Sequence, residues 1–142
     1  MNPPTSAKPP AFRHTHRVVY ADCTLGNHIY YARYLHLLEA ARGEYFRSLG
    51  KTFAAWQEDG FIFPVIEVQL RYKSPARYDE LLQIEVTPIR ADGIRLTFGY
   101  RVLGTDGTVK VEAETFHVCT SIHEKPKRLP GQLMEALGHS AK

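Results

Sequence analysis

Cysteine is scarce in this chain: Cys23 and Cys119 are the only two among 142 residues. Neither belongs to a CxxC pair, so the sequence has neither the disulfide framework of a small secreted domain nor a zinc ribbon. So few cysteines are typical of a reducing compartment, and we expect a cytoplasmic protein. No histidine is placed in the sequence to activate either thiol, so both are expected to pack as small hydrophobic side chains.

Long hydrophobic runs are also lacking. No segment approaches the ~20 consecutive apolar residues of a membrane-spanning helix, and the first ten residues lack the apolar centre of a signal peptide. We therefore expect no membrane partner. Residues 1–10 contain four of the nine prolines, which predicts a flexible leader, and residues 138–142 are expected to form a tail. A single domain is predicted over residues 11–137.

Neither sign of charge dominates, because 18 lysines and arginines stand against 15 aspartates and glutamates. Acidic residues interrupt most of the basic ones, so the sequence contains no basic stripe long enough to follow a phosphate backbone. We therefore expect no nucleic-acid partner. A small anionic ligand needs only a few cations and fits this balance better.

Several catalytic motifs are absent as well: the sequence contains no GxSxG elbow, Walker A loop, GxGxxG turn or HExxH helix. Of the seven histidines, only His14 and His16 share a strand face, and two ligands do not make a closed metal site. We therefore expect no metal centre.

A helical pattern is what the sequence does contain. Apolar residues recur with a period of about 3.6 residues between Tyr31 and Leu49, and Gly50 follows as a natural terminator. This pattern predicts one long helix over residues 31–49. A short second helix is predicted over residues 53–58, where Asp59-Gly60 closes it.

Alternation of apolar and polar residues predicts the strands. They are expected within residues 11–22, 66–72, 82–86, 94–102 and 108–121. Asp92-Gly93 and Asp106-Gly107 predict hairpins between successive strands, which are therefore expected to be antiparallel. In the last strand the apolar phase changes at Phe116, which predicts a bulge or two-sided burial near Thr115. One strand, a long helix and four further strands make an α+β domain.

Two charges interrupt the apolar face of the long helix. Arg42 falls near the centre of that face, and Glu39, three residues earlier, falls near its edge. Core helices rarely carry such charges unless they are paired or functional. The two side chains are expected to form an ion pair with each other, or else Glu39 is expected to serve in catalysis.

The residues from Tyr20 to Arg42 read YADCTLGNHIYYARYLHLLEAAR. This run resembles the signature of the hotdog-fold acyl-CoA thioesterase superfamily, in its 4-hydroxybenzoyl-CoA thioesterase-like branch. The residues that match are Tyr20, Asp22, His28, Ile29, Ala32, Tyr34, Glu39, Ala41 and Arg42. Residues 72–79 and 127–130 further resemble a strand-to-strand corner and the C-terminal end of that family, so the resemblance covers residues 12–137.

The resemblance implies a hotdog fold, in which a curved antiparallel sheet of about five strands wraps around a long central helix. It also implies a thioesterase, a hydrolase that splits an acyl thioester into a free acid and a thiol. Coenzyme A or an acyl carrier protein would deliver the acyl group, and no cofactor is expected because coenzyme A is part of the substrate. Unpaired sheet edges further predict a homodimer or homotetramer.

The chain departs from the family pattern at Thr24, which occupies the position of the family's catalytic aspartate. Thioester hydrolysis needs a group that attacks the acyl carbon or deprotonates water, and a threonine hydroxyl does neither at neutral pH without a helper. Three neighbours are candidates. Asp22 lies two residues earlier. Glu39 is expected at the edge of a buried face, where desolvation makes a carboxylate more basic. His28 is the third candidate, because histidine is a common base in catalysis at neutral pH.

The rest of the machinery that the resemblance implies does not depend on that aspartate. The family holds the thioester carbonyl oxygen with a backbone N–H at the start of the long helix, where free N–H groups and the helix dipole favour negative charge. In this chain the N–H belongs to Tyr31, with Tyr30 beside it. Coenzyme A brings phosphate groups, for which Lys73, Ser74 and Arg77 are the candidate binding residues.

Two other activities remain open at this point. Thr24 favours a hotdog protein that binds an acyl thioester without hydrolysing it. A hotdog dehydratase or hydratase needs a histidine with a partner acid, for which His28 and Glu39 form the candidate pair.

Overall fold

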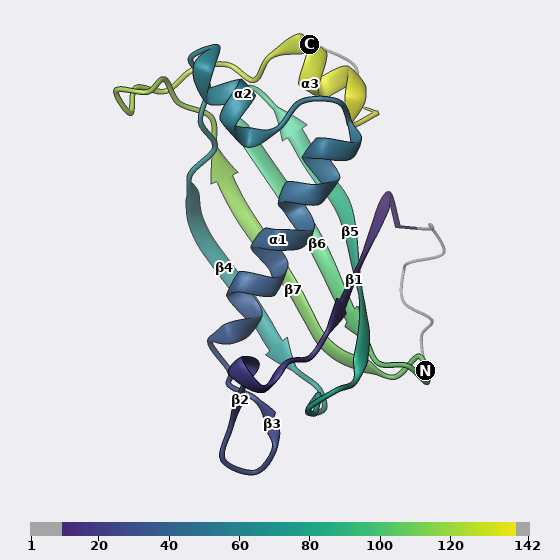
Figure 1. The fold of residues 1–142 in the computed structure, drawn as a ribbon. Coiled ribbons are helices and arrows are strands. Elements are labelled where there is room, and N and C mark those ends of the chain that lie inside the picture. The colour runs from purple at the N-terminus through teal and green to yellow at the C-terminus, as the bar shows by residue number, and fades with distance from the viewer. Residues whose placement is uncertain (1–9, 139–142) are drawn as a thin grey trace.

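The computed structural model describes residues 10–138. Its main sheet is antiparallel, and the long helix α1 (Arg33–Ser48) lies across one face of that sheet (Figure 1). The α+β class predicted from the sequence is therefore confirmed. The predicted leader lies outside the described residues except for Pro10, and the predicted tail lies outside them except for Gly138.

Five strands form the main sheet. They are β1 (Phe12–Arg17), β4 (Val65–Tyr72), β5 (Leu81–Asp92), β6 (Arg95–Leu103) and β7 (Val109–Val118). Their order is β1-β5-β6-β7-β4, and every neighbouring pair is antiparallel. The hairpins predicted at Asp92-Gly93 and Asp106-Gly107 do connect β5 to β6 and β6 to β7. The two edges of the sheet are β1 and β4.

The helices follow the predicted pattern. α1 begins two residues later and ends one residue earlier than expected, and it packs its apolar stripe on the sheet to form the core. α2 (Phe53–Glu58) has the predicted bounds, because the hydroxyl of Thr52 accepts the Ala55 N–H at 3.1 Å and caps its start. α3 (Gly131–Ala136) lies with α2 at the end of the molecule opposite the start of α1 (Figure 1).

The first strand is shorter than its sequence pattern predicts. It ends at Arg17, and the chain then passes through a 3-10 helix, η1 (Tyr20–Asp22), into a small hairpin. The hairpin consists of β2 (Cys23–Thr24) and β3 (His28–Ile29) and lies beside the start of α1 (Figure 1). The apolar residues after Arg17 therefore belong to the turn that leads into the hairpin and not to the main sheet.

The turn of this hairpin lies where the sequence predicts one. Gly26 and Asn27 have φ angles of 92° and 60°, in the left-handed region that glycine and asparagine adopt most readily. The tight turn places Thr24 directly opposite His28 in the antiparallel pairing. Side chains of such directly opposed residues lie on the same face of a hairpin.

The bulge predicted near Thr115 lies in the neighbouring strand β4, whose pairing with β7 shifts register between Val65 and Glu67, opposite His117 and Phe116. In β7 itself the inner positions run on without interruption, and Thr115 and His117 both occupy them, each 2% exposed. Its pairing with β6 has a separate irregularity between Val102 and Leu103. The apolar pattern breaks in the sequence because two inner positions are polar, and the strand itself keeps the same face toward the core.

These two polar residues belong to a buried chain of hydrogen bonds beneath α1. Arg42 donates from Nη1 to the Tyr100 hydroxyl at 3.1 Å, and that hydroxyl lies 2.7 Å from Thr115 Oγ1. Thr115 Oγ1 lies 2.8 Å from Nε2 of His117, whose Nδ1 lies 2.9 Å from the Phe63 carbonyl. Because a carbonyl only accepts, Nδ1 carries the proton. Burial lowers the pKa of His117 to about 4, so the ring is neutral and Nε2 accepts.

Arg42 therefore finds its partner on the sheet and not on its own helix. The predicted ion pair with Glu39 is not formed: within residues 10–138, Arg42 bonds to Tyr100, whereas Glu39 is exposed on α1. A guanidinium group has several donors, and a neutral hydroxyl oxygen can accept a hydrogen bond from one of them. The buried charge is thus satisfied without a carboxylate.

Candidate active site

A pocket of about 550 Å³ opens at the start of α1, between the β2–β3 hairpin and the corner that follows β4. The residues that line it are Thr24, His28, Ile29, Tyr30, Tyr31, Tyr34, Tyr72, Lys73, Ser74 and Pro75. Most of the residues singled out in the sequence thus meet in one place, although they come from three separate segments. Asp22, Glu39 and Arg77 do not line this pocket.

The hairpin that carries Thr24 and His28 is held against the corner after β4. The Ile29 N–H donates to the Ala76 carbonyl at 2.9 Å, and Nη1 of Arg77 donates to the Gly26 carbonyl at 3.2 Å. Arg77 therefore stabilises the hairpin from outside the pocket. Thr24 is exposed at the pocket wall and His28 is half-buried, with Nδ1 lying 3.3 Å from the Ile29 carbonyl.

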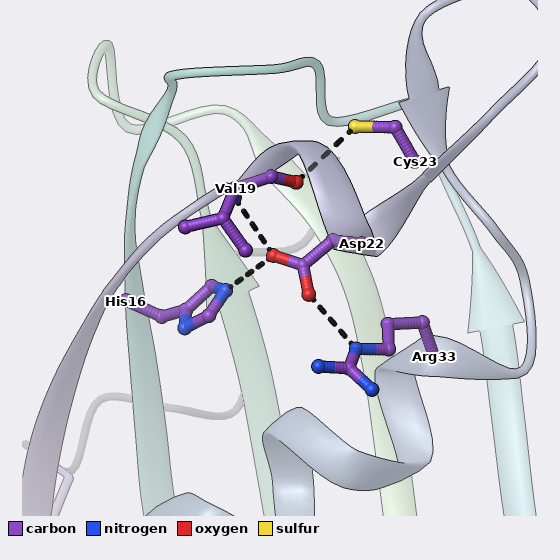
Figure 2. A network of polar contacts seen from close by, with 5 residues as sticks. All are labelled: His16, Val19, Asp22, Cys23 and Arg33. Atoms are coloured by element: carbon purple, nitrogen blue, oxygen red, sulfur yellow. Dashed lines mark hydrogen bonds and ion pairs between the residues drawn. The ribbon is translucent and has the colours of Figure 1, made fainter.

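Asp22 has a different environment from the one its sequence position suggests. Its carboxylate is fully buried, and Figure 2 shows it surrounded by donors. Oδ2 lies 2.8 Å from Nε2 of His16 and accepts the Val19 N–H at 2.9 Å, while Oδ1 accepts from Nε of Arg33 at 2.8 Å. Burial alone would raise the pKa of Asp22, but these hydrogen bonds outweigh it and hold the pKa below its usual value. Such a carboxylate is a structural anchor and a poor base.

The short turn between β3 and α1 is held in part by the backbone of Asp22. The Tyr30 N–H donates to the Asp22 carbonyl at 2.9 Å, and the Arg33 N–H donates to the Tyr30 carbonyl at 2.8 Å. No side chain caps α1, and its first turn holds no acidic residue. Within residues 10–138 the Tyr31 N–H has no hydrogen-bond acceptor, so this donor is free at the positive end of the helix dipole.

Aromatic rings form most of the remaining wall. The rings of Tyr30 and Tyr31 lie 4.8 Å apart, and those of Tyr34 and Tyr72 lie 5.7 Å apart. Burial raises the pKa of Tyr34 to about 12, so its phenol stays neutral at physiological pH. The pocket therefore suits an apolar group that stacks against neutral rings.

Of the other predicted site residues, two border the pocket and one lies away from it. Lys73 borders the pocket and pairs loosely with Glu112 at 3.6 Å, and Ser74 donates from Oγ to the Val109 carbonyl at 3.1 Å. Glu39 is exposed on α1, and within the described part of the chain no hydrogen bond joins it to His28. Glu39 and His28, the candidate acid–histidine pair for a hydratase, are therefore not joined.

Sequence reasoning missed Tyr34 and Tyr72 as parts of the site. Tyr34 belongs to the apolar stripe of α1 and Tyr72 to the alternating pattern of β4, so both read as ordinary packing residues. The signal that could have found them is the resemblance itself, because both fall within stretches that match the family, but only the contact between Tyr34 and Tyr72 shows that they share one wall.

Within residues 10–138, no group of three or more histidine, cysteine, aspartate or glutamate side chains could hold a metal ion. None of the helices described there has the length and apolar character needed to cross a membrane.

Comparison with known proteins places this geometry in context. Residues 26–111 match the thioesterase superfamily. The chain is 32% identical over 124 residues to the acyl-CoA thioester hydrolase YbgC of Escherichia coli, a match that covers 87% of this chain and 92% of that protein. It is 26% identical over 125 residues to the 1,4-dihydroxy-2-naphthoyl-CoA hydrolase of Thermosynechococcus vestitus, covering 84% and 86%. A solved 1,4-dihydroxy-2-naphthoyl-CoA thioesterase from Synechocystis matches with a TM-score of 0.83 at 20% identity, covering 89% and 95%, which confirms the hotdog fold.

Proposed function

The chain belongs to the thioesterase superfamily, and we propose that it is an acyl-CoA thioesterase, which hydrolyses an acyl thioester to a free acid and the thiol of coenzyme A. The observation that carries this proposal is the pocket at the start of α1, where an unbonded backbone N–H lies with Thr24 and His28. A thioesterase needs a donor for the carbonyl oxygen and a base for water, and this pocket offers both types of group.

In this mechanism the Tyr31 N–H donates a hydrogen bond to the carbonyl oxygen of the thioester. The uncapped start of α1 supports this role, because Tyr31 lies just before the N-cap residue Ala32, where the positive end of the helix dipole favours negative charge. When water attacks the acyl carbon, charge develops on the carbonyl oxygen, and the same N–H stabilises it.

His28 serves as the general base. It lines the pocket, whereas the Asp22 carboxylate is already bonded to three donors and Glu39 is exposed on α1. His28 takes a proton from the attacking water while the new C–O bond forms, and the C–S bond breaks as the intermediate collapses. The proton then passes from His28 to the departing thiolate, so that one water yields one acid and one thiol. Thr24, opposite His28, orients the water through its hydroxyl.

The substrate lies across the pocket with its two halves on different surfaces. The acyl group packs against the tyrosine rings. The phosphate groups of coenzyme A, or the phosphopantetheine arm of a carrier protein, are bound by Lys73 and Ser74 at the border of the pocket and by Arg77 beside the hairpin. The half-exposed pair between Lys73 and Glu112 is weak enough to be exchanged for a phosphate. We also place the enzyme in the cytoplasm, consistent with the free state of Cys23 and Cys119.

A panel of acyl-CoA esters tests this function directly. Short-chain, long-chain and aromatic esters are incubated with the protein, and the released thiol is measured with a thiol reagent. We expect turnover of at least one class above the rate without protein. Failure of every ester to be cleaved would contradict the proposal.

A second candidate function is non-hydrolytic binding of an acyl thioester. One observation favours it: among the described residues, no carboxylate lines the pocket. Calorimetric binding of an acyl-CoA ester without thiol release would support this alternative over the thioesterase.

We further propose that the enzyme is a homodimer that pairs through the edge strand β4. The side chains of Val65, Ile66, Val68 and Tyr72 are 43%, 54%, 39% and 49% exposed. An edge strand with exposed apolar side chains and unpaired backbone groups is a site for pairing with another chain. A homotetramer would add a second contact to this dimer.

The Val68→Lys variant is expected to convert the dimer into a monomer. Val68 lies opposite Thr115, on the face of the sheet that carries the core, so a lysine there would bury an unpaired charge in the dimer contact. Light scattering of the wild type should give twice the 16.2 kDa chain mass, and the variant should give that mass once. Gln69→Lys, one residue along on the opposite face, is the matched control and should stay dimeric. A monomeric wild type at micromolar concentration would exclude the dimer.

A further inference from the structure

We propose that Tyr72 is a positioning residue for thioester hydrolysis, because its hydroxyl holds the Tyr31 carbonyl and so fixes the turn that presents the Tyr31 N–H to the substrate oxygen. This inference rests on the proposed function and adds a residue to it. Tyr72 is the last residue of β4, and its hydroxyl donates to the Tyr31 carbonyl at 2.9 Å. The two residues are 41 positions apart in the chain.

The other backbone hydrogen bonds of the turn from Tyr30 to Ala32 go to η1 and to the start of α1. The Tyr30 N–H donates to the Asp22 carbonyl, the Tyr30 carbonyl accepts the Arg33 N–H, and the Ala32 carbonyl accepts the Leu35 N–H. Among the described residues, Tyr72 is the one partner of the Tyr31 carbonyl. The peptide between Tyr31 and Ala32 is thus fixed from the β4 side by a single hydrogen bond.

In both peptides that flank Tyr31, the carbonyl accepts a hydrogen bond and the N–H has no partner among the described residues. The Tyr31 N–H shares a peptide with the bonded carbonyl of Tyr30, and the Ala32 N–H shares a peptide with the carbonyl that Tyr72 holds. Neither N–H has an acceptor within residues 10–138. A hydrogen bond to a carbonyl strengthens the N–H of the same peptide as a donor. The bond from Tyr72 therefore strengthens the Ala32 N–H as a donor and holds in place the turn whose Tyr31 N–H receives the substrate oxygen. The Tyr72 hydroxyl itself is not needed to touch the substrate.

The hydroxyl of Tyr72 is suited to this task. Burial, together with the nearby Tyr31 phenol, raises the pKa of Tyr72, so the hydroxyl keeps the proton that it donates. Its ring packs edge-on against Tyr34 at 5.7 Å and lines the pocket independently of the hydroxyl. Binding of the acyl group depends on the ring, whereas the orientation of the turn depends on the hydroxyl, and this separates the two roles in an experiment.

The Tyr72→Phe variant removes only the hydroxyl. We expect kcat toward the best acyl-CoA ester to fall about 10-fold, since a weakened and misaligned donor costs less than a deleted one. KM and the melting temperature should stay close to the wild-type values because the ring is kept. The amide proton of Ala32 should move upfield in the NMR spectrum, which a merely structural role elsewhere would not produce. Tyr78→Phe is the matched control: Tyr78 is 52% exposed, compared with 49% for Tyr72, and lies outside the pocket.

The outcomes separate this inference from the function on which it rests. A wild type without thioesterase activity overturns the proposed function and the positioning role with it. An active wild type whose kcat and Ala32 amide shift are unchanged in Tyr72→Phe overturns the positioning role alone. A rise in KM with unchanged kcat also overturns it, because Tyr72 would then contribute only to binding.

Discussion

The His28→Gln variant is expected to lose about 10²–10⁴-fold in kcat toward any acyl-CoA ester that the wild type hydrolyses, the usual contribution of a positioned general base. Glutamine is similar in size and can still bond to the Ile29 carbonyl, but it cannot take a proton from water. The loss should therefore fall on kcat, while KM and the melting temperature stay near the wild-type values. Thiol release under saturating substrate measures the effect.

An exposed histidine on α1 provides the control for this variant. His36 is exposed and does not line the pocket, so His36→Gln should keep full activity. A His28→Gln variant with wild-type kcat would remove His28 from the mechanism. A variant that lost activity together with its melting transition would assign His28 to the fold of the hairpin instead.

The Thr24→Asp substitution is expected to restore about 10²–10⁴-fold of kcat when it is introduced into the inactive His28→Gln variant. Position 24 lies directly opposite position 28 in the hairpin and lines the same pocket, so a carboxylate there can deprotonate the same water. In the wild-type background the same substitution should add little, because His28 already performs this step. The two changes are thus expected to be strongly non-additive, as for residues that share one task.

Two further variants make this experiment decisive. Thr24→Asn has nearly the shape of the aspartate without its basicity, and in the His28→Gln background it should restore nothing. Asp22→Asn should lower the melting temperature, because an amide cannot accept from His16, Val19 and Arg33 at once, while the folded enzyme keeps most of its kcat. If Asp22→Asn abolished turnover in a fully folded protein, Asp22 and not His28 would be the base.

Local pattern was sufficient for most of the secondary structure. The period of the apolar residues located α1, and α2 with its cap at Thr52 had its predicted bounds. The two Asp-Gly pairs marked both hairpins of the main sheet. These features are predictable because periodicity and turn chemistry depend on neighbours a few residues away. β1 ended earlier than predicted because the apolar residues after Arg17 belong to a turn, whereas the apolar phase of β7 broke because its inner positions Thr115 and His117 are polar.

The sequence by itself thus determined the α+β class, the long helix, the hairpins and, through its resemblance to a family, the region where the site would lie. It could not rank Asp22, His28 and Glu39 as candidate bases, because their basicity depends on partners brought together by folding. Asp22 meets His16 from β1 and Arg33 from α1 and becomes buried and fully bonded, whereas Glu39 is left exposed. Tyr72 reaches the start of α1 only because β4 pairs with β7 at the far edge of the sheet. Burial and hydrogen bonding between distant segments are properties of the tertiary structure, and they decided which of the candidate groups remains free for chemistry.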